Sequence, residues 1–327
     1  MKKLLLITLI ILLFANLFGC DKGNYNTYKE ASINTGDVAK GKALYNVVIE
    51  NKFDTEGLPK EEIKELNYIK EIEMTMNLKH DYKNNQVISR NYFNFGGMGF
   101  DSIFYMNGEN LFLKMPILGK YLNLNQIEQG KEYTEGLEID EKLIERIRDK
   151  WLNALKEENV VSGEKALLDT EDGTVKATHY SITLDNNKLN TLVNETVDII
   201  LENPELIGEL SKYIRIGGKE NTNPTEIAKY IEEYLETVSI EDFKYDTYID
   251  IDDYIVKTDL EFGLIYKNNG RLKGNKFIFN SKRWDIEKEQ QFVFPELNES
   301  NTLEIEDADQ GIPVIFEDIF NNGEESR

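Results

Sequence analysis

Few side chains in this 327-residue chain have the reactivity needed for covalent or metal chemistry. There is one cysteine, Cys20, and there are two histidines, His80 and His179. A single cysteine has no partner for a disulfide, so the thiol of Cys20 is available for another modification. We expect His80 at the polar end of a strand and His179 inside another, and neither has a metal-ligating partner at helical or hairpin spacing. The histidines therefore indicate neither a catalytic base nor a metal centre.

Two further patterns come close to binding motifs but lack a required residue. The acidic run from Asp250 to Asp253, followed by Glu261, imitates a calcium loop, but Ile255 stands where that loop needs glycine. The run from Gly96 to Gly99 has neither the P-loop lysine nor dinucleotide-binding spacing, and it predicts a strand break or a loop at a cavity mouth. The sequence also lacks a G-x-S-x-G nucleophile motif. We therefore predict no enzymatic activity, no metal and no cofactor.

Cys20 stands at the end of an apolar N-terminal segment. A basic start, Met1 to Lys3, is followed by an apolar run from Leu4 to Phe14, and the segment closes with Leu17 to Cys20, which reads Leu-Phe-Gly-Cys. This resembles the lipobox of bacterial lipoproteins, in which the preceding peptide is removed and the cysteine carries a diacylglyceryl group. The resemblance implies a signal peptide over residues 1–19 and lipidation of Cys20.

An ordinary secretory signal and a short membrane span are the alternatives for this segment. A spanning helix needs about 20 apolar residues, whereas this run has about 15. A secretory signal more often ends in two small residues at A-x-A spacing. Phe18 is bulkier than the residue usually found two places before a lipobox cysteine, which is the main point against lipidation.

The net charge of the chain indicates how the protein can and cannot attach to a membrane. Without Lys2 and Lys3, 36 basic residues face 60 acidic ones, which gives the processed chain a formal charge of −24. Such a surface repels nucleic acid and anionic headgroups. A diacylglyceryl group supplies the two chains that stable anchoring requires. We therefore predict that the protein is held at a membrane by Cys20 and not by its charge.

The residues after the cysteine predict a tether and then a helix. Residues 20–34 are polar and have no apolar period, which is typical of a flexible tether. Thr35 or Asp37 can cap the helix that follows. Its apolar residues recur at three- and four-residue steps: Val38, Leu44, Tyr45, Val48 and Ile49.

A first block of strands begins at Ile72, where the apolar period changes to two. Ile72, Met74, Met76 and Leu78 alternate with polar residues, as in a half-buried antiparallel strand. Asn107-Gly108 is a tight-turn signal. Further strands are predicted over 87–95, 103–106, 111–115 and 121–124.

Helices and a second block of strands follow. Helices are predicted near 143–155, 186–201, 204–215 and 224–238, and strands over 160–168, 175–184, 243–249, 254–266, 271–281 and 285–294. No helix connects paired parallel strands in this order. It therefore predicts the α+β class, with helices packed on the concave side of a large, curved, mostly antiparallel sheet.

The order of elements, together with the segment from Tyr105 to Pro116 (Tyr-Met-Asn-Gly-Glu-Asn-Leu-Phe-Leu-Lys-Met-Pro), resembles the LolA-like lipoproteins of bacterial surfaces, relatives of the LolA, LolB and LppX carriers. The resemblance covers a single domain over residues 35–296 and leaves an acidic, loosely attached tail over 297–327. It implies an open half-barrel whose helices enclose an apolar cavity that accepts acyl chains in the better-known relatives.

We therefore expect an extracytoplasmic lipoprotein of the bacterial cell envelope that binds a hydrophobic or acyl-chain ligand. Because Cys20 fixes it to a membrane, a receiver, a local transfer step or a sensor is favoured over a long-range shuttle. The alternative is a lipid-anchored interaction or sensing module with a solid core, in which the same side chains only fill space. The residues predicted to line the cavity are apolar and adaptable: Met74, Met76, Met106, Met115, Leu260, Phe262 and Leu264.

Overall fold

A computed structural model describes residues 23–116, 119–126, 141–204, 206–208, 223–267 and 270–303. One twelve-stranded sheet, which is not closed into a barrel, runs through these residues in the order β12-β6-β5-β4-β3-β2-β1-β11-β10-β9-β8-β7. All strand pairs are antiparallel except the short β12–β6 pair, which is parallel. The predicted α+β class with a large, mostly antiparallel sheet is therefore confirmed.

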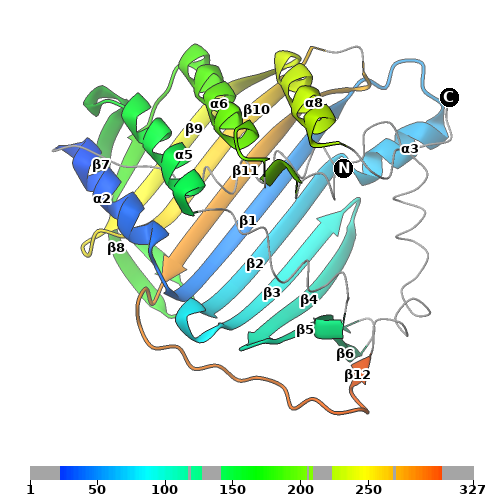
Figure 1. Cartoon of the computed structure of the whole chain (residues 1–327), viewed down its shortest axis with the longest axis vertical. Coiled ribbons are helices and arrows are strands. Elements are labelled where there is room, and N and C mark those ends of the chain that lie inside the picture. The colour runs from blue at the N-terminus through cyan, green and yellow to red at the C-terminus, as the bar shows by residue number, and fades with distance from the viewer. Residues whose placement is uncertain are drawn as a thin grey trace.

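The strands fall into two meanders that meet at β1 and β11 (Figure 1). The first meander is β2–β6 and the second is β7–β11. The bounds are β1 Lys40–Phe53, β2 Glu71–Asp81, β3 Gln86–Phe95, β4 Met98–Asn107, β5 Asn110–Met115, β6 Lys120–Asn123, β7 Val160–Thr170, β8 Gly173–Ile182, β9 Val238–Asp250, β10 Ile255–Tyr266, β11 Leu272–Trp284 and β12 Thr302–Leu303.

Four helices lie over the second meander on one face of the sheet, which we name the helical face (Figure 1). These are α2 (Asn24–Gly36), α5 (Glu141–Ala154), α6 (Asn186–Leu201) and α8 (Pro224–Glu236), while α3 (Lys60–Tyr68) lies at the end of β1 and β2. Asn223 caps α8 by accepting a hydrogen bond from the Thr225 amide at 2.9 Å, and Pro224 takes the first helical position. Most of the predicted 204–215 helix lies outside the described residues.

The core lies between these four helices and β7–β11. Trp151 of α5 is completely buried, and its indole N–H donates to Thr196 Oγ1 of α6 at 2.7 Å. Tyr28 of α2 is equally buried and meets the ring of Tyr245 on β9 edge-on at 6.3 Å. The helices therefore form one apolar layer with the strands beneath them.

Two predictions for the first part of the domain are wrong. The predicted tether at 20–34 contains α2, whose Tyr28, Ala31 and Ser32 are buried. The helix predicted from Thr35 onward is strand β1, which lies between β2 and β11. The buried residues of β1 alternate, but Leu44 and Val48 on its half-buried outer face add further apolar residues, and the combined spacing imitated a helix.

The predicted strand over 285–294 is also absent. Asp285 and Glu287 have φ angles of 51° and 57°, in the left-handed region, so the chain leaves the sheet after Trp284. Residues 285–301 then pass along the first meander to the edge of the sheet beside β6, where Thr302 pairs with Tyr121 (Figure 1). The start of the predicted loose tail is thus tied to the sheet.

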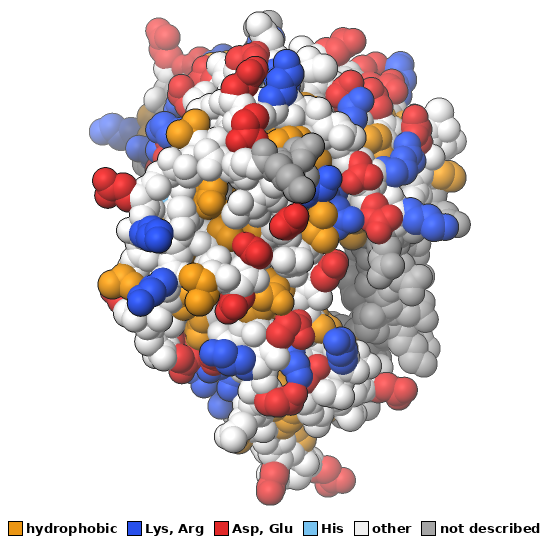
Figure 2. All heavy atoms as spheres, turned by 90° about the vertical axis from the view of Figure 1, so that its left-hand side faces the viewer, with side chains coloured by type: hydrophobic (Ala, Val, Ile, Leu, Met, Phe, Trp, Pro, Cys, Tyr) orange, Lys and Arg blue, Asp and Glu red, His pale blue; other side chains and the backbone are white. Residues whose placement is uncertain are grey.

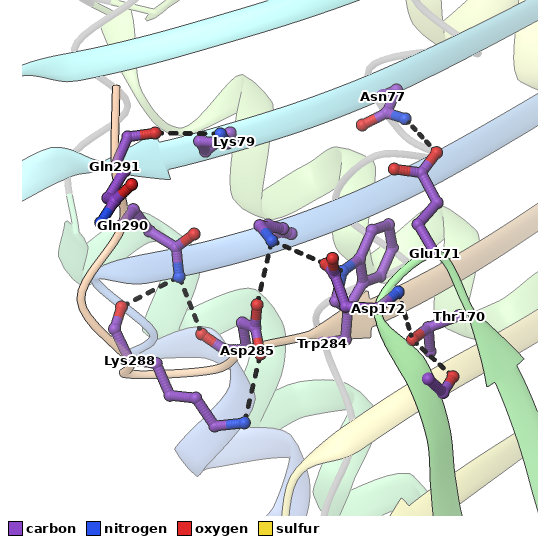
Figure 3. A network of polar contacts seen from close by, with 12 residues as sticks. Asn77, Lys79, Thr170, Glu171, Asp172, Trp284, Asp285, Lys288, Gln290 and Gln291 are labelled. Carbon is purple, nitrogen blue, oxygen red and sulfur yellow. Dashed lines mark hydrogen bonds and ion pairs between the residues drawn. The ribbon is translucent and has the colours of Figure 1, made fainter. Parts of the chain in front are cut away.

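The tip of the β7–β8 hairpin is fastened to the outer face, the face opposite the helices (Figure 3). Asp172 accepts hydrogen bonds from Lys42 Nζ of β1 and from the Trp284 indole of β11, both at 2.6 Å. Glu171 accepts from Asn77 of β2 at 2.6 Å, and Lys42 also forms a 3.0 Å ion pair with Asp285. The hairpin therefore links strands from both meanders.

Cys20, the predicted lipidation site, lies outside the described residues, as does the whole of the predicted signal peptide. Among the helices within the described ranges, none is both long and apolar enough to cross a bilayer.

Candidate ligand site on the helical face

Cross-strand register places apolar residues of β2–β4 in two continuous rows on the helical face, while Asn91 and Ser102 interrupt the row that begins at Met76. Residues directly opposite one another in an antiparallel pair point to the same side of a sheet. Val47 of β1, whose partner Phe279 is in the core, pairs with Met74 of β2, Met74 pairs with Phe93 of β3, and Phe93 pairs with Phe100 of β4. The predicted common face of Ile72, Met74, Met76 and Leu78 therefore continues the core face.

The structure separates the seven predicted lining residues into two groups. Leu260, Phe262 and Leu264 of β10 are at most 6% exposed and belong to the core beneath the helices. Phe262 stacks on Phe277 at 5.2 Å. Packing within the protein occupies these three side chains, so they are no longer our candidates for contact with a ligand.

Met74, Met76, Met106 and Met115 form the second group, on the helical face of β2, β4 and β5, where no described helix lies over the strands (Figure 1). All four are only partly buried, and Phe93 beside Met74 is 38% exposed. We name this surface the methionine face. Its members are Met74, Met76, Phe93, Phe95, Met98, Phe100, Phe104, Met106, Leu111, Leu113 and Met115.

A small buried cluster lies at the base of the methionine face, near the end of β2. Ala43, Leu78 and Val87 form it, with Tyr45, Met76, Phe104 and Met106 packed against it. Tyr45 also packs against the main core and lies 6.2 Å from the Phe279 ring. The methionine face and the helix-covered core are therefore in contact through Tyr45.

Polar side chains interrupt the apolar surface at this point. Arg283 of β11, which pairs with Ala43, is 7% exposed, and its guanidinium lies 5.6 Å from the centre of the Tyr45 ring. It donates a 3.3 Å hydrogen bond to Ser281 Oγ. His80 of β2, also 7% exposed, packs against Tyr82 with ring centres 4.4 Å apart and the ring planes tilted by 31°.

The electrostatics of this cluster follow from burial. Burial, and then the positive charge of Arg283, lower the pKa of His80, so its imidazole is neutral at neutral pH. Burial, with Tyr45 nearby, raises the pKa of Tyr82 to about 12, although half of the residue's surface is exposed. Tyr82 therefore lies at the boundary between this cluster and solvent.

The sequence reasoning missed Arg283 and its neighbours. The predicted strand stopped at residue 281, whereas β11 continues to Trp284. The alternation of Phe277, Phe279 and Ser281 on the buried face would have placed Arg283 on that face. A charged residue at an inward position of a strand is the signal that could have found it.

The other chemically notable residues have separate surroundings. His179 lies within 2.7 Å of Asp246 Oδ1, measured from its Nε2 atom. Burial raises the pKa of Asp250, whose carboxylate accepts from the amides of Asp252 and Tyr254. Gly96 and Gly97, with φ angles of 58° and 80°, form the β3–β4 turn. No cluster of potential metal ligands occurs within the described ranges.

Three grooves formed by described residues lie away from the seven predicted residues. One of about 430 Å³ lies between α2 and β7–β9, with Thr27 and Leu167 in its wall. Val161, Leu167 and Ile251 are exposed at this edge of the sheet, where Figure 2 shows hydrophobic side chains between charged ones. A second of about 430 Å³ adjoins Gly96, and a third of about 230 Å³ lies on the outer face.

No protein-family model and no curated protein matches this chain. The interpretation of the helical face therefore rests on the geometry and chemistry of its side chains.

Proposed function

We propose that this protein is a membrane-anchored extracytoplasmic lipoprotein that binds a hydrophobic or acyl-chain ligand on its methionine face. The observation that carries the proposal is the contrast between the two halves of the helical face. Four helices bury the half formed by β7–β11, whereas the apolar side chains over β2–β5 are only partly buried.

The composition of the methionine face supports this function. Monomeric proteins rarely expose large contiguous apolar patches unless these take part in binding. Methionine is unbranched and polarizable, so it can repack around ligands of irregular shape. Burial of each methylene of an acyl chain contributes about 0.8 kcal/mol, so contact along several strands would retain a chain.

The predicted anchor and the resemblance to LolA-like carriers point to the same function. A domain tethered through Cys20 would keep its site close to a bilayer, which is the source of amphiphilic ligands. A receiver, a local transfer step or a sensor is compatible with such a tether, whereas long-range shuttling is not.

Phe93 and Tyr92 provide a matched test of this proposal. They are neighbours on β3 with equal exposure, 38%, but they point to opposite faces of the sheet. A soluble form, residues 20–327 with Cys20→Ala, would be titrated with the neutral fluorescent probe N-phenyl-1-naphthylamine. We expect Phe93→Glu to weaken probe binding by about 10-fold, because it places a carboxylate in an apolar site, and Tyr92→Glu to leave it unchanged.

Equal effects of the two substitutions, or no binding of the probe or of co-purified lipid by native mass spectrometry, would exclude a ligand site on the methionine face. The protein would then fit the second candidate function, a tethered interaction module. The exposed Val161 and Leu167 on edge strand β7 favour that alternative, because an edge strand offers unpaired backbone groups to a partner. Crosslinking in cells to a stoichiometric protein partner, lost on altering β7, would support it.

A further inference from the structure

Arg283 is unusual because its cationic side chain is buried without a carboxylate beside it. The residue is 7% exposed, and its guanidinium forms no ion pair with the described part of the chain. A guanidinium has five N–H donors, whereas the only hydrogen bond that it donates to a described residue goes to Ser281 Oγ. A buried charge is costly unless an opposite charge and hydrogen bonds compensate it.

Arg283 has no carboxylate partner among the described residues, although acidic residues are abundant in this chain. With 60 acidic against 38 basic residues, a carboxylate partner would be easy to supply. Asp81, next to His80 in sequence, instead lies in register with Lys40 and accepts hydrogen bonds from the Asn84 amide and side chain. Arg283 therefore retains donor capacity for an anion from outside the chain.

His80 has a second incomplete polar group at the same place. Its Nδ1 atom is buried and has no hydrogen-bond partner among the described residues. The Tyr82 ring lies 4.4 Å from the imidazole and is about half exposed, so this cluster lies close to solvent. A ligand that reached Arg283 could also meet the imidazole of His80.

Arg283 stands at the head of a row of side chains that crosses the first meander. The row continues in register through Ala43, Leu78, Ser89, Phe104 and Leu113, and Phe104 and Leu113 belong to the methionine face. Four strand spacings, about 19 Å, separate Arg283 from Phe104. Ala43, Leu78 and Ser89 are themselves at most 8% exposed. An amphiphile with its headgroup at Arg283 would therefore lay its tail over the partly buried side chains that pack against this cluster, Tyr45, Met76, Phe104 and Met106.

We infer that Arg283, assisted by His80 and Ser281, binds the anionic headgroup of an amphiphile, a carboxylate or a phosphate, whose tail lies on the methionine face. This inference rests on the proposed function and narrows its ligand to acidic amphiphiles. Planar guanidinium donors match the geometry of both headgroups, and charge-assisted hydrogen bonds to them are strong in a buried setting.

The test compares ligands that share a twelve-carbon tail. Dodecanoate, dodecyl phosphate and dodecanol would each displace N-phenyl-1-naphthylamine from the soluble form of residues 20–327, and inorganic phosphate would be the free-anion competitor. We expect at least one of the two anionic amphiphiles to bind about 10-fold or more tightly than dodecanol. Arg283→Gln should remove this preference and leave dodecanol binding unchanged.

Lys282→Gln is the matched control, since Lys282 precedes Arg283 on β11, lies on the opposite face of the sheet and donates to the Asp169 carbonyl at 3.2 Å. It should keep the preference for anionic ligands. Thermal unfolding would verify that each variant is folded. If Arg283→Gln does not fold, Arg283→Lys can be used instead, because it keeps the positive charge but lacks the planar guanidinium group. We expect it to lower the preference for anionic over neutral amphiphiles several-fold.

Three outcomes would overturn the inference. Equal affinity for anionic and neutral amphiphiles in the unsubstituted protein would contradict the headgroup site but would still agree with an apolar ligand site. Equal weakening of all ligands by Arg283→Gln would show a purely structural role. Displacement by inorganic phosphate as efficient as by dodecyl phosphate would assign the site to a free anion. By contrast, failure of every amphiphile and of the probe to bind would reject the proposed function itself.

Discussion

The guanidinium of Arg283 and the ring of Tyr45 lie 5.6 Å apart, where the helix-covered core meets the methionine face. A cation over an aromatic ring gains about 0.5–2 kcal/mol, which is less than the cost of desolvating a charge in the interior. Contact with the Tyr45 ring alone therefore does not compensate a fully desolvated guanidinium.

Arg283→Met should consequently stabilise the ligand-free protein. Replacement of the buried cation by an apolar side chain of similar length removes its desolvation cost, and we expect the free energy of unfolding to rise by about 1 kcal/mol or more. Urea denaturation monitored by circular dichroism would measure the change. Lys282→Met, on the outer face, should alter the unfolding free energy by less than about 0.5 kcal/mol. A marked loss of stability in Arg283→Met would mean that the chain itself compensates the charge.

Tyr28 tests whether α2 belongs to the folded domain. The side chain is fully buried against Tyr245, and α2 is also held by hydrogen bonds from Tyr25 to the Leu152 carbonyl and from the Ile255 amide to Thr35. Tyr28→Ala should lower the free energy of unfolding by about 3–5 kcal/mol, the range for loss of a large buried aromatic side chain.

Glu30→Ala is the control for this substitution, because Glu30 lies on the exposed side of the same helix. It should change the free energy of unfolding by less than about 0.5 kcal/mol. If Tyr28→Ala were equally neutral in a denaturation experiment, the segment would act as the flexible tether that its polar sequence suggests.

The sequence predicted most of the strands because their signals are local. The alternation over β2 and the turn at Asn107-Gly108 are confirmed by the pairing of the strands that they bound. The common face of Met74 and Met76 followed from the same alternation.

What the sequence did not predict depends on contacts between distant residues. Strand β1 was mistaken for a helix because Leu44 and Val48 on its half-buried outer face add apolar residues between the buried ones. Helix α2 has only three buried residues, and its position depends on partners such as Leu152 and Ile255. The position of Arg283 beside Tyr45 arises only when the last long strand pairs with the first one.

Trp151 should make the largest single contribution to the contact between α5 and α6. It is completely buried, and its indole N–H donates to Thr196 Oγ1. We expect Trp151→Ala to cost about 3–5 kcal/mol of unfolding free energy, through the cavity and the lost hydrogen bond. The neighbouring Lys150→Ala, which removes a partly exposed ion pair with Glu195, should cost less than about 1 kcal/mol. Similar losses in the two variants would contradict this account of the interface.

The hairpin tip on the outer face should detach in acid. Hydrogen bonds from Lys42 and then from Trp284 hold the pKa of Asp172 below its ordinary value of 3.8. A carboxylate with a lowered pKa favours the folded state fully above its ordinary pKa, and this contribution is lost as the pH falls through the lowered value. We expect a change in Trp284 fluorescence below roughly pH 4.

Asp172→Asn should abolish the part of this transition that belongs to the hairpin tip, because the amide does not titrate. Asp169→Asn is the control, since the Asp169 side chain is on the same hairpin and is exposed. A transition that is identical in Asp172→Asn and in the unsubstituted protein would assign the pH dependence to other carboxylates.

Cys20→Ala should release the protein from the membrane fraction of cells. A formal charge of −22 for the whole chain opposes adsorption to anionic headgroups, and stable anchoring of a domain requires about two acyl chains. Without the thiol no thioether-linked diacylglycerol can form. After ultracentrifugation, the folded Cys20→Ala domain should therefore be found in the supernatant and not in the membrane pellet. Lys22→Ala, two residues away, leaves the thiol in place and should remain in the pellet. Retention of Cys20→Ala in the pellet would show that another part of the chain, or an uncleaved N-terminal segment, attaches the domain to the membrane.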